Sequence, residues 1–149
     1  MNLKNRISSD MKAAMRARES ERLSAIRMLL AAIQQKEVDE RIELDDAQVV
    51  TVVDKLCKQR RDSIEQYTLA GRQDLADRER AEIEVLSAYL PAQADEAEIA
   101  AEIEAAITTL GAAGPQDMGK VMGLLKQRLA GRADLSAVSA GVRARLSGR

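Results

Sequence analysis

Lysine and arginine gather at the end of this sequence in a pattern that could bind a polyanion. Residues 118–149 contain seven basic side chains and a single acid, Asp134, whereas residues 91–117 contain six acids and no base. The net charge of −1 for the whole chain hides this separation. A basic segment beside an acidic one creates a field that can steer a polyanion to one end of a protein. The seven bases are Lys120, Lys126, Arg128, Arg132, Arg143, Arg145 and Arg149.

Two glycines lie in the middle of this basic segment. Gly119 and Gly123 are about one turn apart in an expected helix over residues 117–130, on a face shared with Lys126 and flanked by Lys120. Glycine inside a helix costs about 1 kcal/mol relative to alanine, so we expect some close approach to offset this cost. Two interpretations remain open. Either a neighbouring helix packs tightly there, or a nucleic-acid backbone is admitted between the lysines.

The last expected helix, residues 135–146, carries the remaining arginines. Its apolar positions point inward, which leaves Arg143 and Arg149 outward and Arg145 at the flank. These arginines could form a solvated face or a phosphate-binding surface. The sequence contains only two aromatic residues, and neither lies in this segment. Binding to RNA would therefore depend on its shape and phosphates, because stacking on bases needs aromatic side chains.

Other residues that could do chemistry favour structural roles. The sequence has no histidine, which removes the usual acid–base group near neutral pH and most zinc and copper sites. Helix capping and solvation explain the acids crowded into residues 37–46. Cys57 is expected to lie in the apolar core. No phosphate-binding glycine loop or dinucleotide motif occurs. We therefore expect no catalytic residue, no metal and no cofactor.

The amino-terminal region contains a second group of bases. Residues 1–36 hold eight bases against three acids, and Lys4, Lys12 and Arg16 share one flank of an expected helix. Charges scattered over amphipathic helices usually serve solubility, and we favour that interpretation here.

The elements that position these residues are predicted to be helices. The interior must be filled by Leu, Ile, Val, Met and Ala, since Phe and Trp are absent, and this favours an all-α fold. Seven of the eight glycines lie at residue 111 or later and Pro91 follows an apolar stretch, which indicates a boundary near residue 90. We predict an amino-terminal domain of four helices over residues 1–90 and a three-helix bundle over residues 91–149. The predicted helices are 2–18, 20–38, 45–70, 73–89, 96–110, 117–130 and 135–146.

Several termini of these helices are marked by capping residues. Asp45 followed by Gln48 predicts a capping box, and Asp95 and Asp134 are predicted caps. Ser20 is predicted to cap the second helix. No apolar run approaches the roughly 20 residues needed to span a bilayer, so we expect no membrane association and a cytoplasmic protein.

Three stretches of the chain resemble the GatB/YqeY domain family, and together they span most of its length. They are residues 21–37, residues 58–93 and residues 117–146, the last reading DMGKVMGLLKQRLAGRADLSAVSAGVRARL. The chain is similar to the free-standing YqeY-type members. It departs from many relatives at Leu135, where they have glycine after the Ala-Asp pair.

This resemblance implies an all-helical fold whose last domain is similar to the tail of the B subunit of aspartyl/glutamyl-tRNA amidotransferase. That tail helps to hold tRNA, which would place Lys120, Lys126, Arg128 and Arg132 on a tRNA-facing surface. The resemblance does not include the catalytic domain that activates and transfers the amide. We therefore expect an accessory module that binds tRNA or an aminoacyl-tRNA-handling enzyme.

Two alternatives remain. A helical protein–protein adaptor would use a groove between the long amino-terminal helices. A carbon–nitrogen ligase with glutamine as amido donor would need nucleotide and metal ligation that no motif here supplies.

Overall fold

The protein is an all-α protein, as the sequence predicts. In the computed structural model, residues 1–148 are described, and within them the chain forms seven α-helices, one short 3-10 helix and no β-strand. The chain divides into two compact units, Met1–Leu90 and Pro91–Arg149. Each unit has its own apolar core, so each is described by itself. Among the described residues, no helix is both long enough and apolar enough to cross a membrane.

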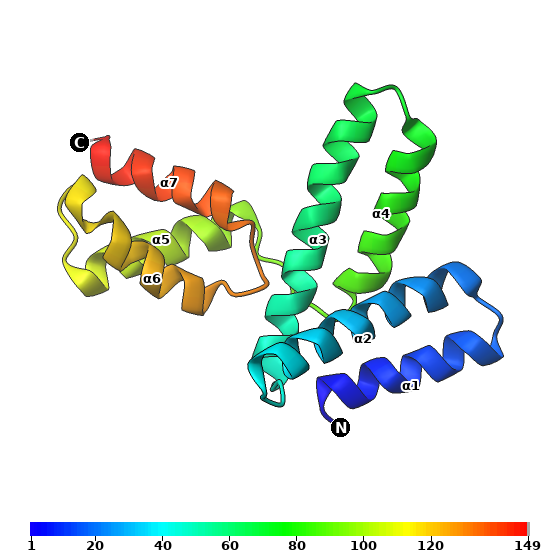
Figure 1. Ribbon diagram of the computed structural model, residues 1–149. Helices are drawn as coiled ribbons and strands as arrows, with labels where there is room; N and C mark the ends of the chain where they lie inside the picture. The colour runs from blue at the N-terminus through cyan, green and yellow to red at the C-terminus, as the bar shows by residue number, and fades with distance from the viewer. Residues whose placement is uncertain (149) are drawn as a thin grey trace. The chain divides into compact units, whose positions relative to one another are not determined.

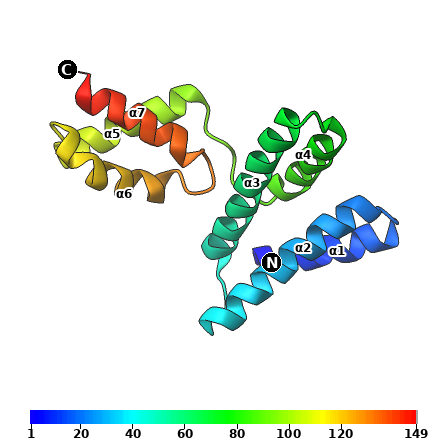
Figure 2. The ribbon, with the colours of Figure 1, turned by 45° about the horizontal axis from the view of Figure 1, so that its top comes forward.

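The amino-terminal unit consists of two helical hairpins. In Figures 1 and 2, α1 lies alongside α2, and α3 lies alongside α4. Because the sequence lacks large aromatic residues apart from two tyrosines, the core of this unit is filled by interdigitating aliphatic side chains. The helices are α1 (Leu3–Arg16), α2 (Ser20–Glu40), α3 (Asp46–Leu69) and α4 (Gln73–Ser87). Fully buried residues of the core include Ile7, Ile26, Leu29, Val49, Val53, Cys57 and Leu86.

The start of α3 confirms the predicted capping box. Asp45 accepts a hydrogen bond from the Gln48 N–H at 2.8 Å, and the Gln48 side chain accepts one from the Asp45 N–H at 2.9 Å. The prediction for α2 is wrong, because Ser20 is already the first helical residue and Glu19, which precedes it, makes no capping hydrogen bond. Helix α2 also continues two residues beyond the predicted end, to Glu40. It ends there because Arg41 adopts a left-handed conformation with φ of 55°.

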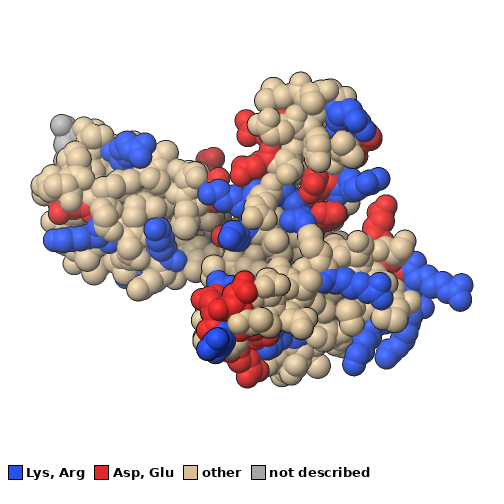
Figure 3. Space-filling view, viewed as in Figure 1, with Lys and Arg blue, Asp and Glu red and all other residues tan. Residues whose placement is uncertain are grey.

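The acidic residues at the end of α2 and the start of α3 have structural roles. Figure 3 shows acidic side chains gathered where these two helices meet. Glu37 forms an ion pair with Lys4 at 2.7 Å and accepts a hydrogen bond from the Leu44 N–H at 2.8 Å. Asp46 accepts a hydrogen bond from the Leu3 N–H at 2.9 Å. These contacts fasten the start of α1 to the connection between α2 and α3.

The carboxy-terminal unit is a bundle of three helices, visible at the yellow-green to red end of the ribbon in Figure 1. Helices α5 and α7 are capped by Asp95 and Asp134, which accept hydrogen bonds from backbone N–H groups at 2.8 Å and 3.0 Å, as predicted. The elements are α5 (Glu96–Leu110), the 3-10 helix η1 (Pro115–Asp117), α6 (Met118–Arg128) and α7 (Leu135–Ser147). The buried side chains of this unit include Ile103, Ala106, Val121, Leu125, Leu129, Val138 and Val142.

The segment that precedes α5 is held to the loop between α6 and α7. The Ala94 N–H donates to the Arg132 carbonyl at 2.8 Å, and the Gln93 side chain donates to the Gly131 carbonyl at 2.7 Å. Arg132 in turn donates from Nε to the Ala92 carbonyl at 2.9 Å. Arg132 thus contributes both its backbone and its side chain to the closure of this bundle.

Candidate nucleic-acid interface on the carboxy-terminal unit

One face of α6 exposes bare backbone between two lysines. Val121 and Leu125 are fully buried on the inner side of this helix, and this fixes its rotation. Gly123 lies two positions from each of those residues and Gly119 two positions before Val121, so both glycines are exposed on the outer side. Lys120 and Lys126 are exposed with them, so the sequence pattern and the structure assign the same residues to this face.

The two glycines do not serve close packing within this unit. A Cβ atom built on Gly119 or Gly123 would meet no neighbouring atom within 4 Å. The interpretation that a helix of the bundle packs tightly against them is therefore wrong. The cost of placing glycine inside a helix, about 1 kcal/mol relative to alanine, is not offset by any contact that this unit makes.

A third glycine, which the sequence did not single out, does allow close packing. A Cβ atom at Gly141 in α7 would lie 3.1 Å from Cδ1 of Ile103 in α5. This distance is closer than ordinary van der Waals contact, so Gly141 lets the two helices approach. Only its partner on another helix distinguishes Gly141 from the open glycines of α6, and the sequence alone gives no signal for that partner.

Three of the predicted phosphate-binding arginines are paired with acids of α5. Arg132 lies 2.7 Å from Glu98, and Arg128 lies 3.6 Å from Glu102. Arg145 is in contact with Glu104. The acidic and basic segments of the sequence thus neutralise each other partly across the bundle.

The other bases of this segment differ in their surroundings. Lys120, Lys126 and Arg143 are exposed, and in the described part of the chain none of them forms an ion pair. Asp117 lies close enough to Lys120 to be affected by its charge. The pKa of Asp117 is lowered chiefly by the hydrogen bond from the Ala113 N–H, with a smaller effect of the Lys120 charge. Arg149, also predicted to point outward, lies outside the described residues.

The face of α6 formed by Gly119, Gly123, Lys120 and Lys126 is hereafter the open face of the unit, and Arg143 is a further exposed base on α7. Figure 3 shows separate basic side chains on a largely uncharged surface of this unit. Such an arrangement can contact phosphates through point charges while the glycines allow a backbone to come near.

The basic residues of the amino-terminal unit are less suited to bind phosphate together. Lys4 is held by Glu37 at 2.7 Å and lies 3.5 Å from Glu43, and these carboxylates raise its pKa. Lys12 and Arg16 are exposed. Of the three bases that the sequence places on this flank, only Lys12 and Arg16 are not paired with these carboxylates.

The remaining candidates for chemistry are Cys57, as a nucleophile, and groups of acids, as metal ligands. Cys57 is fully buried, and burial raises the pKa of its thiol, which disfavours the reactive thiolate. No cluster of three or more potential metal ligands occurs within residues 1–148.

Comparison with known proteins gives relatives among fungal mitochondrial proteins. The chain is 38% identical over 112 residues to altered inheritance of mitochondria protein 41, mitochondrial, of Lachancea thermotolerans, a match that covers 73% of this chain and 60% of the relative. The protein of the same name from Eremothecium gossypii is 38% identical over 58% of this chain and 48% of its own length. The one from Pyrenophora tritici-repentis is 30% identical over 86% of this chain and 71% of its own length. The matches thus cover about half to two thirds of the length of most of these relatives.

These names contradict the predicted cytoplasmic location, since all three relatives are named as mitochondrial proteins. The prediction rested on the lack of an apolar run long enough to span a bilayer. Proteins of an aqueous organelle interior also lack such a run, so this criterion does not discriminate between the two compartments.

The match to a protein family covers nearly the whole chain. Residues 4–146 match the family described as Yqey-like protein. They include both units and all seven helices, apart from the first residue of α1 and the last of α7. The chain is therefore a member of the YqeY-like protein family.

Proposed function

We propose that this protein is a tRNA-binding accessory module in which the open face of the carboxy-terminal unit contacts the phosphate backbone of the RNA. In this proposal the protein holds tRNA for an aminoacyl-tRNA-handling enzyme, and catalysis belongs to that enzyme. The observation that carries the proposal is the exposed pair Gly119 and Gly123 between lysines that have no carboxylate partner in the described chain.

The glycine pair supports a ligand that approaches the helix backbone closely. Each interior glycine weakens α6, and the unit itself gains no packing in return. A phosphate backbone would supply the missing contact, since it can lie against bare peptide groups while the flanking lysines neutralise its charge.

The choice of tRNA rests on the resemblance of this unit to the tail of the amidotransferase B subunit. That resemblance runs over residues 117–146, which include the whole open face. The structure suggests one revision of the residues that it implies. Arg128 and Arg132 are occupied by Glu102 and Glu98, so Lys120, Lys126 and Arg143 are the better candidates for phosphate contact.

The experiment is a titration of the full-length protein with total tRNA at several salt concentrations, with an unrelated duplex RNA as control. We expect saturable binding that prefers tRNA and weakens as salt rises, because phosphate contacts release counterions. Absence of any preference for tRNA would contradict the proposal. Glutamine-dependent amidation of charged tRNA by the purified protein would overturn the assignment of a binding role alone.

A variant with reversed charges locates the site. Lys120→Glu, Lys126→Glu and Arg143→Glu together should abolish tRNA binding and leave the helical content unchanged. The matched control reverses three exposed bases of the amino-terminal unit with Lys12→Glu, Arg27→Glu and Lys58→Glu. If the control variant lost binding and the first variant kept it, the RNA site would lie on the amino-terminal unit.

A further inference from the structure

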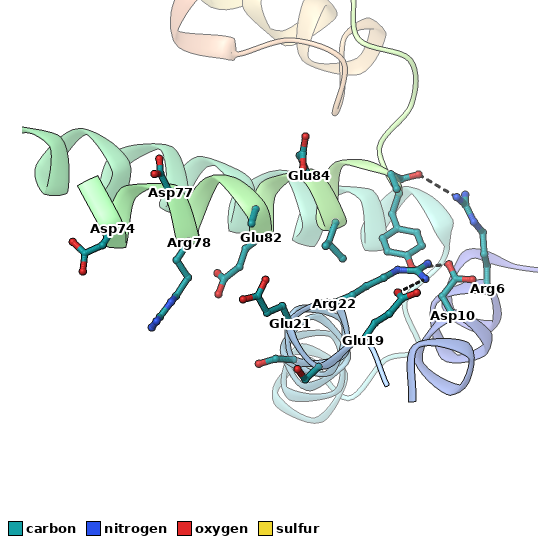
Figure 4. Close-up of a pocket in the computed structure, with 16 residues that line it drawn as sticks. Arg6, Asp10, Glu19, Glu21, Arg22, Asp74, Asp77, Arg78, Glu82 and Glu84 are labelled. Atoms are coloured by element: carbon teal, nitrogen blue, oxygen red, sulfur yellow. Dashed lines mark hydrogen bonds and ion pairs between the residues drawn. The ribbon is translucent and has the colours of Figure 1, made fainter. Parts of the chain in front are cut away.

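The amino-terminal unit contains a wide groove on the side of α4 that faces the first turn of α2. Its volume is about 1320 Å³, and residues of α1, α2 and α4 line it. Figure 4 shows Glu82 of α4 and Glu21 of α2 pointing into the space between these two helices, with Asp10 and Arg6 of α1 at one end. The groove lies entirely within residues 1–90, so it is separate from the open face of α6.

The floor of the groove is a strip of small apolar residues on α4. Ala81, Val85 and Ala88 follow one another at steps of four and three residues, so they lie on one face of the helix. Ala76 and Leu86, on the other side of α4, are fully buried in the core. Within the strip, Val85 is partly buried against this core, whereas Ala81 and Ala88 are exposed to the groove.

The end of the groove is held in place by contacts around Tyr89. The Tyr89 hydroxyl donates a hydrogen bond to Asp10 at 2.6 Å, and the Arg6 guanidinium lies 5.1 Å from the centre of the tyrosine ring. Arg6 also donates to the Ala88 carbonyl at 3.2 Å. These contacts connect the end of α4 to α1, so the apolar strip is a preformed surface.

The lining of the groove is predominantly acidic. Seven carboxylates and three guanidinium groups line it. Four of these acids form ion pairs, and three of the pairs use arginines just outside the lining, Arg60, Arg72 and Arg80. Glu21 and Glu84 are exposed, and no ion pair engages either of them in the part of the chain that the structure describes. The carboxylates are Asp10, Glu19, Glu21, Asp74, Asp77, Glu82 and Glu84, and the guanidinium groups are those of Arg6, Arg22 and Arg78.

The size and shape of the groove argue for a polypeptide. Its volume exceeds the roughly 300–1,000 Å³ of usual small-molecule pockets. Within the described residues no group of acids is arranged to hold a metal ion. An apolar strip at helical spacing between charged walls is the arrangement that receives an amphipathic helix.

We propose that this groove binds a helical segment of a partner protein that carries an apolar stripe flanked by lysine or arginine. The small side chains at Ala81 and Ala88 allow the partner helix to approach α4, and the exposed carboxylates of Glu21 and Glu84 favour a cationic partner. This site does not depend on the RNA contact proposed for α6, and together the two would let one chain hold an RNA and a basic protein.

The test uses the full-length protein without RNA and a synthetic amphipathic helix of about 18 residues with a leucine stripe and lysine flanks. Its controls are a scrambled peptide of the same composition and a version with glutamate flanks. We expect the scrambled peptide to bind at least about tenfold more weakly and the glutamate version not to bind. Equal binding of the scrambled peptide would overturn the proposal, because charge alone would then explain the affinity.

Two protein variants place the peptide in the groove. Glu21→Lys with Glu84→Lys reverses the two exposed acids, and Ala81→Arg fills the apolar floor. Each should weaken binding of the lysine-flanked peptide by about tenfold or more. The matched control, Asp62→Lys with Glu65→Lys, makes the same change of charge on exposed residues of α3 outside the groove and should leave binding within about twofold.

A second copy of the chain is the alternative occupant. Sedimentation of the unmodified protein and of the Ala81→Arg variant decides between the two. A monomer in both cases, with the peptide results above, supports the proposal. A dimer that Ala81→Arg converts to monomer would overturn it and assign the groove to self-association.

Discussion

Arg132 and Glu98, 34 residues apart in the chain, form an ion pair at 2.7 Å within the carboxy-terminal unit. The pair joins the loop after α6 to the first turn of α5. The negative charge of Glu98 also interacts favourably with the positive end of the α5 helix dipole. The ion pair shows how the acidic and basic segments of the sequence meet. Much of the positive charge that the sequence displays serves the bundle itself.

Replacement of Arg132 with alanine should destabilise the carboxy-terminal unit by about 1–2 kcal/mol. The change removes the hydrogen bonds to the Ala92 carbonyl and to Glu98. In the described part of the chain, the segment before α5 is then held only by its hydrogen bonds to the backbone carbonyls of residues 131 and 132. Glu98→Ala removes only the half-exposed carboxylate and should cost about 0.5 kcal/mol. Urea unfolding followed by helical circular dichroism measures both values. Equal costs for the two variants would show that the contact with Ala92 contributes little.

Replacement of Gly123 with alanine should stabilise the free protein by about 1 kcal/mol and weaken tRNA binding. The stabilisation follows from helix propensity, since the added methyl group enters open space. The weaker binding follows if an RNA backbone must approach that surface. Gly141→Ala is the matched control, because its methyl group would press on Ile103, and it should stabilise less than Gly123→Ala. Unchanged RNA affinity of the Gly123→Ala variant would contradict close approach at this position.

Neutralisation of the acids on α5 should increase the affinity for tRNA. Glu98→Gln, Glu102→Gln and Glu104→Gln together would release Arg132, Arg128 and Arg145 from their ion pairs. Each arginine that then contacts a phosphate should steepen the dependence of log K on log salt by about one unit. Titrations at several salt concentrations measure this slope. An unchanged slope would indicate that these arginines face away from the RNA.

Removal of the charge on Glu37 should lower stability near neutral pH and have less effect in acid. The hydrogen bond from Lys4, and then that from the Leu44 N–H, lowers the pKa of Glu37 below its ordinary value of 4.5. A depressed pKa in the folded state contributes stability that is present above the unfolded value and is lost as the pH falls through the folded value. The difference in unfolding midpoint between the unmodified protein and Glu37→Gln should therefore be constant above about pH 5 and shrink below it.

Glu43→Gln is the control for this pH dependence. Glu43 lies farther from Lys4, at 3.5 Å, and its side chain is 83% exposed. The Glu43→Gln substitution should therefore change the unfolding midpoint less than the Glu37→Gln substitution does at every pH. A larger effect of Glu43 would mean that long-range charge, and not the Lys4 contact, governs the acid response.

Local patterns were sufficient to predict most helices of this protein. The capping box at Asp45 and Gln48 and the cap at Asp95 form within one turn of the chain, so residue types at fixed spacing specify them. The failure at Ser20 has the same origin. Helix α2 begins at Ser20 itself, so Glu19 and not Ser20 occupies the capping position. Residue type alone does not show whether a serine caps a helix or is its first residue.

The sequence by itself determined the all-α class, the buried stripes and the residues that share a face of α6, because all of these depend on periodicity along a single helix. Only the tertiary structure decided which charges remain available. Arg132 and Glu98 meet because α5, α6 and α7 pack together, and no spacing in the sequence encodes that contact. The same holds for the glycines. Gly141 and Gly123 are equivalent in sequence, and the presence or absence of a neighbouring helix gives them opposite roles.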